Sequence, residues 1–242
     1  PLIFAVAILF AGNDSYAGKI DKAYEASRIY DYFKAKKTFE KSLKSNNSIA
    51  SFGLATIYFR RDNPFHHLDS AYVYINRAKS TYSLVKVNQK ARYNSYVNEN
   101  KIDSLRQLIS SSYFEIAQKE HTIASYTNYI QQHNWADEFP RAIYLRDSLA
   151  LEEAKVSNTS AAYANFQSTY PNSDFSGEAE NLYMLSRYNE LTVAGTIDSY
   201  EHFLEVEPTN SYRSKAETIL YELVTKPNTI ASLELFLERY QD

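Results

Sequence analysis

The sequence predicts an all-α fold, a solenoid of stacked helical hairpins, and three observations support this. Gly and Pro are scarce, 5 and 6 in 242 residues, so the chain has few residues that break helices. Many of its 22 Tyr and 13 Phe recur at helical spacing, which places rings on one face of each helix. One sequence pattern also returns about every 37 residues, a period typical of hairpins that bury their apolar faces by stacking.

The first helix of each hairpin is marked by a Thr that precedes apolar residues by four and by seven positions. This pattern begins at Thr122, Thr159, Thr196 and Thr229. A Thr hydroxyl can accept a hydrogen bond from a free backbone N–H and so begin a helix, a contribution of about 1 kcal/mol. No Glu stands at the third following position, where it would complete a capping box. The rings predicted to lie in the core are Tyr126, Tyr163, Tyr200, Phe166, Phe203 and Phe236.

The second helix of each hairpin follows a short turn. Pro171 and Pro208 end two of the first helices, because proline cannot continue a helix. Trp135 stands at the matching place in an earlier unit, and we expect it to cover the turn rather than to bind a ligand. A small residue with a large one on the same face then lets two helices approach closely. These pairs are Ala142 with Leu145, Ala179 with Leu182, and Ala216 with Ile219.

The amino-terminal third repeats the hairpin in looser form, with Ala35 and Phe39 four residues apart on one helical face. Between residues 83 and 118 the repeat blurs, and we expect helices with an irregular connection near Asn98 to Asn100. The predicted organisation is therefore amino-terminal hairpins over 18–82, an irregular helical connector over 83–118 and carboxyl-terminal hairpins over 119–242.

The first 17 residues are predicted to be the remnant of a secretory signal peptide. Leu2 to Ala11 is an apolar run too short to span a bilayer, and Ser15-Tyr16-Ala17 follows as a small-x-small cleavage site. A buried first helix is the alternative, although a run with no polar face fits it poorly. The missing initiating Met, and a last helix without a second helix after it, lead us to expect that the natural chain is longer.

Three segments resemble tetratricopeptide repeats. Lys19 to Asn46 is similar to one full unit, with Ala35 and Phe39 at its small and aromatic anchors. Tyr163 to Ala179 and Tyr200 to Ala216 resemble the variant found in periplasmic and outer-membrane proteins of Gram-negative bacteria, such as barrel-assembly lipoproteins and cell-division coordinators. The Tyr, Asn, Lys and Ser bias also resembles envelope repeat proteins of the Bacteroidetes, some of which serve secretion or gliding machineries.

This resemblance implies a right-handed α-solenoid in the periplasm or at the outer-membrane periphery. It also implies a protein partner, either a peptide segment or a subunit of an outer-membrane assembly, secretion or motility complex. Contact with a membrane would then be indirect, through that complex. The chain departs from the lipoproteins of this type in having no cysteine for lipid attachment.

Residues for catalysis or cofactor binding do not form a recognisable motif. The chain has no cysteine, its 5 His lack metal-ligand spacing, and its 5 Gly stand singly, so no phosphate-binding loop can form. We therefore expect a protein that is not an enzyme and that holds no cofactor or metal. With 26 basic and 29 acidic residues and no long run of one sign, the composition does not predict a surface for nucleic acid or for anionic lipid.

The expected binding surface consists of aromatic residues outside the repeat register and of the loop near residue 65, because rigid amphipathic rings suit protein recognition. Two alternatives stay open on the same scaffold, a carbohydrate-binding protein and a cell-wall-active helical enzyme. In the second of these, adjacent histidines in the loop could bind a metal together with a remote carboxylate. The candidate surface residues are Tyr93, Tyr96, Tyr144, Tyr188, Phe65, His66 and His67.

Overall fold

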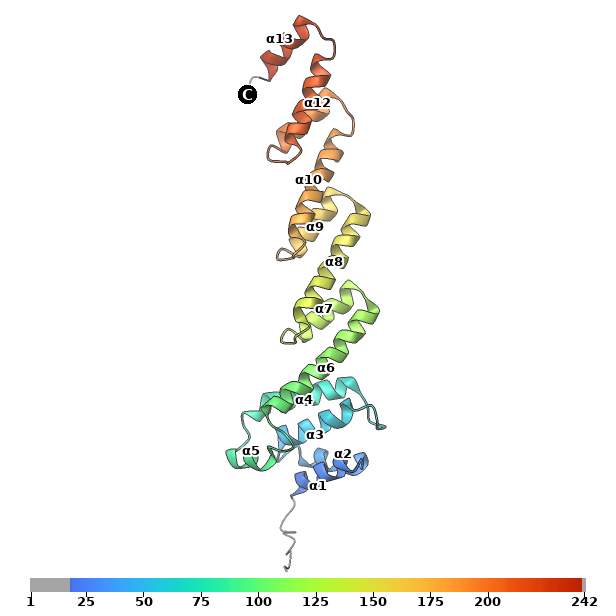
Figure 1. The fold of residues 1–242 in the computed structure, drawn as a ribbon, viewed down its shortest axis with the longest axis vertical. Helices are drawn as coiled ribbons and strands as arrows, with labels where there is room; N and C mark the ends of the chain where they lie inside the picture. The colour runs from blue at the N-terminus through green and yellow to red at the C-terminus, as the bar shows by residue number, and fades with distance from the viewer. Residues whose placement is uncertain (1–17, 241–242) are drawn as a thin grey trace, which may run out of the picture. The chain divides into compact units, whose positions relative to one another are not determined.

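The computed structural model of the chain describes residues 18–240, and these form 13 α-helices and no strand. The helices pack chiefly against their neighbours in the chain, as in a solenoid-like repeat fold (Figure 1). The predicted all-α class is confirmed. The predicted signal-peptide remnant, residues 1–17, lies outside the described residues. Within those residues, no helix combines the length and the apolar character that crossing a bilayer requires.

The chain divides into two compact units, with the division between Ile116 and Ala117. The segment over 83–118, predicted as a connector, contributes its helices almost entirely to the first unit. The helices of the first unit are α1 (Lys19–Arg28), α2 (Tyr32–Ser42), α3 (Asn47–Phe59), α4 (Leu68–Tyr82), α5 (Val87–Tyr93) and most of α6 (Glu99–Glu120). Those of the second unit are α7 (Ile123–Gln132), α8 (Phe139–Ser157), α9 (Ser160–Thr169), α10 (Ser176–Thr192), α11 (Ile197–Val206), α12 (Arg213–Thr225) and α13 (Ile230–Arg239).

The core of the first unit is built around α3, whose sequence is almost entirely apolar or small. Ala35 and Phe39 of α2 are both fully buried against it, as their spacing predicted. Gly53 of α3 faces the ring of Phe39 directly: a Cβ atom at this glycine would lie 2.3 Å from the ring Cζ. The absence of a side chain at residue 53 is therefore what allows the ring to enter the core.

The irregular connection lies slightly earlier than predicted. Residues 94–98 form it, and α6 already begins at Glu99, so Glu99 and Asn100 are helical. The side chain of Asn98 accepts a hydrogen bond from the backbone N–H of Lys101 at 3.0 Å. Asn98 thus ends the connection by capping the helix that follows.

The junctions between hairpins in the second unit share one backbone conformation. The residue before each helix-starting Thr has a positive φ: 48° at His121, 47° at Asn158, 64° at Gly195 and 49° at Asn228. Glycine and asparagine are the residues that tolerate this left-handed region best. The left-handed residue turns the chain sharply, so that the next hairpin begins at once.

Each junction is then capped as the sequence predicted, because each Thr hydroxyl accepts a hydrogen bond from the backbone N–H three residues later. A reciprocal bond, not predicted, is made by serine rather than by glutamate. The backbone N–H of Thr122 donates to the Oγ of Ser125 at 3.2 Å. Ser199 and Ser232 accept in the same way, so three of the four junctions hold complete capping boxes.

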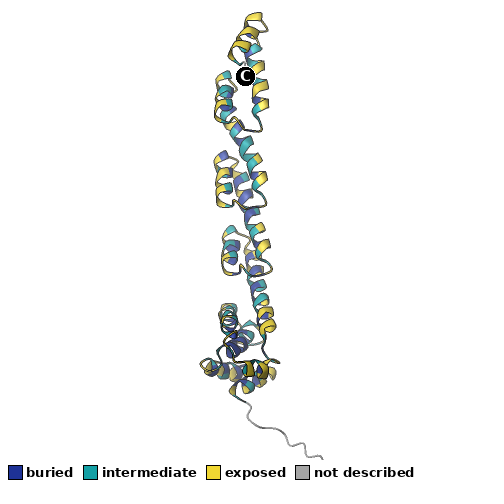
Figure 2. Cartoon of the chain, turned by 90° about the vertical axis from the view of Figure 1, so that its left-hand side faces the viewer, coloured by how far each residue is buried: buried dark blue, intermediate teal, exposed yellow. Residues whose placement is uncertain are grey.

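The predicted ring positions lie between the helices of the hairpins, where Figure 2 shows the buried residues of the second unit. Five of the six rings are buried as expected, with exposures between 0% and 8%; Phe236 of α13 is only partly buried. Two phenols also reach back to the junction. The Tyr163 hydroxyl donates to Asn158 Oδ1 at 3.1 Å, and a hydrogen bond of 2.9 Å joins the Tyr126 hydroxyl to His121 Nδ1.

The second helices shorten along the unit, from 19 residues in α8 to 17 in α10 and 13 in α12. The shorter α12 accounts for the last repeat period of 33 residues rather than 37. α10 and α12 begin at Ser176 and Arg213, one full repeat apart, so the shortening lies at the carboxyl-terminal end of α12. Four residues are close to one helical turn of 3.6, so α12 ends at nearly the same rotational position about its axis as α10 does.

Candidate functional site

Two of the tyrosines expected on a binding surface are buried, so the prediction is wrong for Tyr93 and Tyr188. Their exposures are 6% and 5%. The ring of Tyr188 lies edge-on to Phe203 with centroids 5.4 Å apart and stacks on Tyr212 at 5.3 Å. These contacts place it in the core between α10, α11 and α12, where it cannot line a groove.

Two further tyrosines keep part of their rings in solvent. Tyr96 stacks on Tyr24 with centroids 4.5 Å apart, and burial is the main cause of the raised pKa of its phenol. Tyr144 is 40% exposed; the Arg141 guanidinium lies 4.9 Å from its ring centroid, and the Phe175 ring centroid lies 5.1 Å from it. The surface role of these two residues stays a prediction.

The loop between α3 and α4 places its three candidate residues differently. Phe65 is partly buried and lies edge-on to Phe33, with centroids 4.8 Å apart. His66 is exposed. His67 caps α4, because its Nδ1 accepts a hydrogen bond from the backbone N–H of Ser70 at 3.1 Å. Within residues 18–240 no group of three or more potential ligands could hold a metal ion, at this loop or elsewhere.

Trp135 lies in the turn between α7 and α8 and is partly buried, with its ring centroid 6.1 Å from that of His133. The seven candidate residues come from both units of the chain. They are spread over the α3–α4 loop, the α5 region of the first unit, and α8 and α10 of the second unit.

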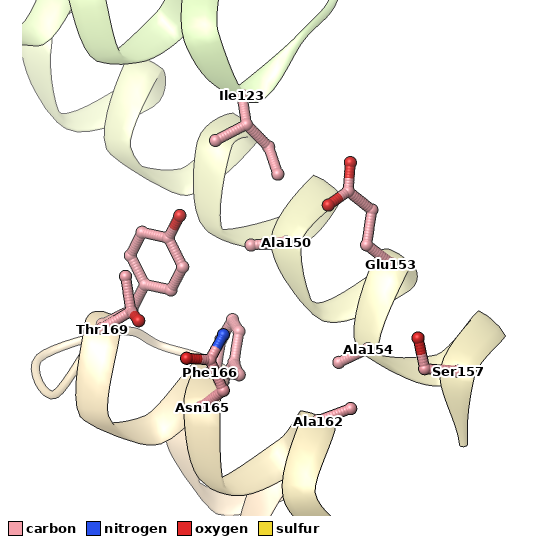
Figure 3. Close-up of a pocket in the computed structure, with 10 residues that line it drawn as sticks. Ile123, Ala150, Glu153, Ala154, Ser157, Ala162, Asn165, Phe166 and Thr169 are labelled. Atoms are coloured by element: carbon pink, nitrogen blue, oxygen red, sulfur yellow. The ribbon is translucent and has the colours of Figure 1, made fainter. Parts of the chain in front are cut away.

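A groove that the sequence analysis did not anticipate opens within the second unit, between α7, α8 and α9. Its volume is about 220 Å³, and Figure 3 shows the side chains of Ala150, Ala154 and Ala162 directed into the space between the helices that carry them. The residues combine a floor of small side chains with a polar rim. They are Ile123, Ala150, Glu153, Ala154, Ser157, Ala162, Asn165, Phe166, Thr169 and Tyr170.

The floor of the groove results from small residues at helical spacing. Ala150 and Ala154 are four residues apart and share one face of α8, and Ala162 faces them from α9. Beneath them Phe166 is almost fully buried, at 2% exposure. Three methyl side chains leave space above this ring that larger residues would fill.

The rim carries hydrogen-bonding groups and one charge. Asn165 and Thr169 stand on α9, and Glu153 stands on α8 as the one ionisable carboxylate in the lining. Among the described residues Glu153 forms no ion pair. The nearby Lys155 instead binds Glu178 at 2.7 Å and Glu152 at 2.9 Å, so it does not neutralise Glu153.

The far edge of the groove is held by a short network. The guanidinium of Arg146 lies 4.8 Å from the ring centroid of Tyr170 and pairs with the buried carboxylate of Asp147 at 2.7 Å. A cation over a ring face is attracted by the ring quadrupole, which fixes the position of Tyr170.

The start of α9 is anchored by a carboxylate from α10. Glu190 accepts hydrogen bonds from the backbone N–H and from the hydroxyl of Ser160, at 2.8 Å and 2.6 Å. These two bonds favour the charged form and lower the pKa of Glu190 below its ordinary value. The groove wall formed by α9 is therefore bonded to α10, the second helix of its own hairpin, and also packs against α8 of the preceding hairpin.

The groove offers hydrogen-bonding groups of the kind that pair with a peptide backbone. The amide of Asn165 can both donate to and accept from a peptide backbone, and small floor residues allow that backbone to approach closely. Glu153 suits a basic or N–H-rich group at one end. The sequence contained a signal for this site, the spacing of Ala150 and Ala154, but the same spacing also marks helix packing. No model of a known protein family matches the chain, and no curated protein matches it either.

Proposed function

We propose that this chain is a non-catalytic scaffold of the bacterial cell envelope, of the tetratricopeptide type, that docks a peptide or a partner subunit. The observation that carries the proposal is the groove between α7, α8 and α9, with its alanine floor and its polar rim. A solenoid of hairpins suits this role, because each unit adds contact surface without changing the architecture.

The chemistry of the groove favours a peptide over a small substrate. Its volume of about 220 Å³ lies below the range of about 300–1,000 Å³ that is usual for sites enclosing small ligands. A segment of chain can instead lay one or two small side chains over Ala154 and Ala162 while its backbone bonds to Asn165. The expected partner segment is extended and carries a basic residue opposite Glu153.

The envelope location rests on the predicted signal peptide and on the resemblance to periplasmic repeat proteins. In that setting the partner is a segment or subunit of an outer-membrane assembly, secretion or motility complex. The scaffold would position this partner and perform no chemistry on it.

A matched pair of substitutions on α9 tests the proposal. Asn165→Arg places a long charged side chain on the groove rim, while Ala161→Arg places the same side chain on the same helix away from the groove. Both positions are exposed, so both variants should fold. Envelope extracts are cross-linked to each protein, and the captured proteins are quantified by mass spectrometry.

The expected result is a partner captured by the natural chain and by Ala161→Arg but lost with Asn165→Arg. A partner retained equally by both variants would exclude the groove as its site. Failure to capture any partner in a reproducible way would count against the scaffold function itself.

A further inference from the structure

A strip of lysines runs along the solvent side of α2. Lys34, Lys37 and Lys41 occupy positions i, i+3 and i+7, which lie on one face of a helix, and all three are exposed. Lys44 is also exposed, in the turn that ends the helix. We call these four residues the lysine face. Although the whole chain has a net charge of −3, the segment 31–44 holds five lysines against two acidic residues.

The charges of the lysine face are not neutralised locally. Within residues 18–240, none of its four side chains forms an ion pair. The two acidic residues of the segment have other partners: Glu40 pairs with Lys36 at 2.6 Å, and Asp31 caps α2 by accepting the N–H of Lys34 at 3.1 Å.

The acids of the neighbouring α1 are engaged in the same way. Asp21 pairs with Arg92 at 2.6 Å, and Glu25 pairs with Arg28 at 2.9 Å. The lysine face therefore presents uncompensated positive charge to solvent.

Exposed apolar side chains lie at the amino-terminal end of this face. Ile29, Tyr30 and Phe33 are 65%, 66% and 69% exposed. Tyr30 adopts a left-handed backbone conformation, with φ of 63°, which is uncommon for a bulky residue and is strained. Arg60 lies 5.5 Å from the Tyr30 ring centroid. A basic helix face with exposed aromatic and aliphatic side chains beside it is typical of a surface that binds at the lipid headgroup layer.

We infer that the lysine face and these apolar residues bind the surface of an anionic phospholipid bilayer. This inference is independent of the groove in the second unit. Protein interfaces are depleted in lysine, and arginine is preferred where a carboxylate is bound with fixed geometry. A strip of four lysines without arginine suits a diffuse anionic surface better, because each flexible ammonium group needs no fixed partner. The net charge of the whole chain, −3, does not indicate this surface, because acidic residues elsewhere outweigh the lysines in the sum.

The test uses the full 242-residue chain and vesicles of phosphatidylcholine with or without phosphatidylglycerol. The apolar run from Leu2 to Ala11 can interact with both kinds of vesicle, so the measured quantity is the difference in affinity between them. The variant Lys34→Gln with Lys37→Gln removes two charges from the face. The control, Lys119→Gln with Lys226→Gln, removes two exposed lysines elsewhere and gives the same net charge.

The natural chain should bind the anionic vesicles more tightly than the neutral ones, and salt should weaken this preference. The double variant on α2 should lose about 30-fold in affinity for anionic vesicles, while the control keeps its affinity. Phe33→Ser should also weaken binding, although all four lysines are present.

Three results would overturn the inference: equal affinity for both kinds of vesicle, an equal loss in the control, or no loss in the α2 variant. Binding to polyglutamate that depends on Lys34 and Lys37, without binding to anionic vesicles, would assign the face to an acidic protein instead.

Discussion

Replacing Gly53 by Ala should destabilise the first unit, although the same change normally stabilises a helix interior by about 1 kcal/mol. The new Cβ would lie 2.3 Å, 2.5 Å and 2.6 Å from three atoms of the Phe39 ring. Carbon atoms in contact are about 3.5–4.0 Å apart, so the ring would have to move by more than ~1 Å. Phe39 is fully buried, with Tyr24 edge-on at 4.9 Å, and it has no free space to enter.

Overpacking of this kind costs about 1–3 kcal/mol, and we expect Gly53→Ala to lower the free energy of unfolding by that amount. Urea unfolding followed by circular dichroism measures the change, and hydrogen exchange in α2 and α3 localises it. The fluorescence of Trp135 is a poor reporter here, because this residue lies in the second unit.

Two further variants complete the test. Gly177→Ala is the matched control, since nothing lies within 4 Å of its added Cβ, and it should leave stability unchanged or slightly higher. Combining Gly53→Ala with Phe39→Leu should cost less than the sum of the single changes, because the smaller side chain yields space. A Gly53→Ala protein at least as stable as the natural one would refute this account of the core.

Three other predictions concern the second unit. Tyr163→Ala should lower the free energy of unfolding by about 3–5 kcal/mol and Tyr163→Phe by about 1 kcal/mol. Asn165→Ala should change it by less than ~0.5 kcal/mol. Similar urea midpoints for all three variants would contradict the repeat register. Gly195→Ala should cost about 1–2 kcal/mol through its left-handed backbone alone, since its Cβ would meet nothing, while Gly195→Asn should be better tolerated, and thermal unfolding distinguishes the two. The pKa of Glu190 is lowered in the folded state from 4.5, so its bonds to Ser160 stabilise the fold above that pH, and this stabilisation is lost as pH falls through the lowered pKa. Glu190→Gln should therefore reduce stability near neutral pH, and its difference in stability from the natural chain should shrink in acid. Stability curves of the two proteins that run parallel with pH would argue against this.

The features that the sequence predicted well are those set by short-range spacing. Thr159 and Tyr163, four residues apart, determine both the start and the buried face of α9, and the structure confirms both. The serine that completes a capping box, as at Ser125, was missed because the expected residue was glutamate. Its hydroxyl makes the same reciprocal bond with a shorter side chain.

The features that the sequence did not predict depend on how one helix meets the next. Tyr188 was expected at the surface because it falls outside the register of the first helices. It is buried because α10 turns this face toward α11, and the register of one helix does not fix the rotation of its neighbour. The groove was missed for a related reason. Ala154 lies in the floor of the groove with 7% exposure, and its sequence signature is the same as that of an alanine that another helix covers completely.

The junction conformation repeated before Thr122, Thr159, Thr196 and Thr229 bears on how such a chain can change in length. Each junction is closed by bonds among residues within about one turn of it, so it needs no partner from a distant hairpin. A duplicated hairpin would therefore carry its own capped junction, and a deleted hairpin would remove only its own junction. Within a hairpin, shortening the second helix by about one whole turn leaves its end at nearly the same rotational position, as α12 illustrates, so the next junction can begin in a similar direction. Insertions and deletions in related chains should accordingly be found in two sizes, a whole repeat or about one turn of the second helix.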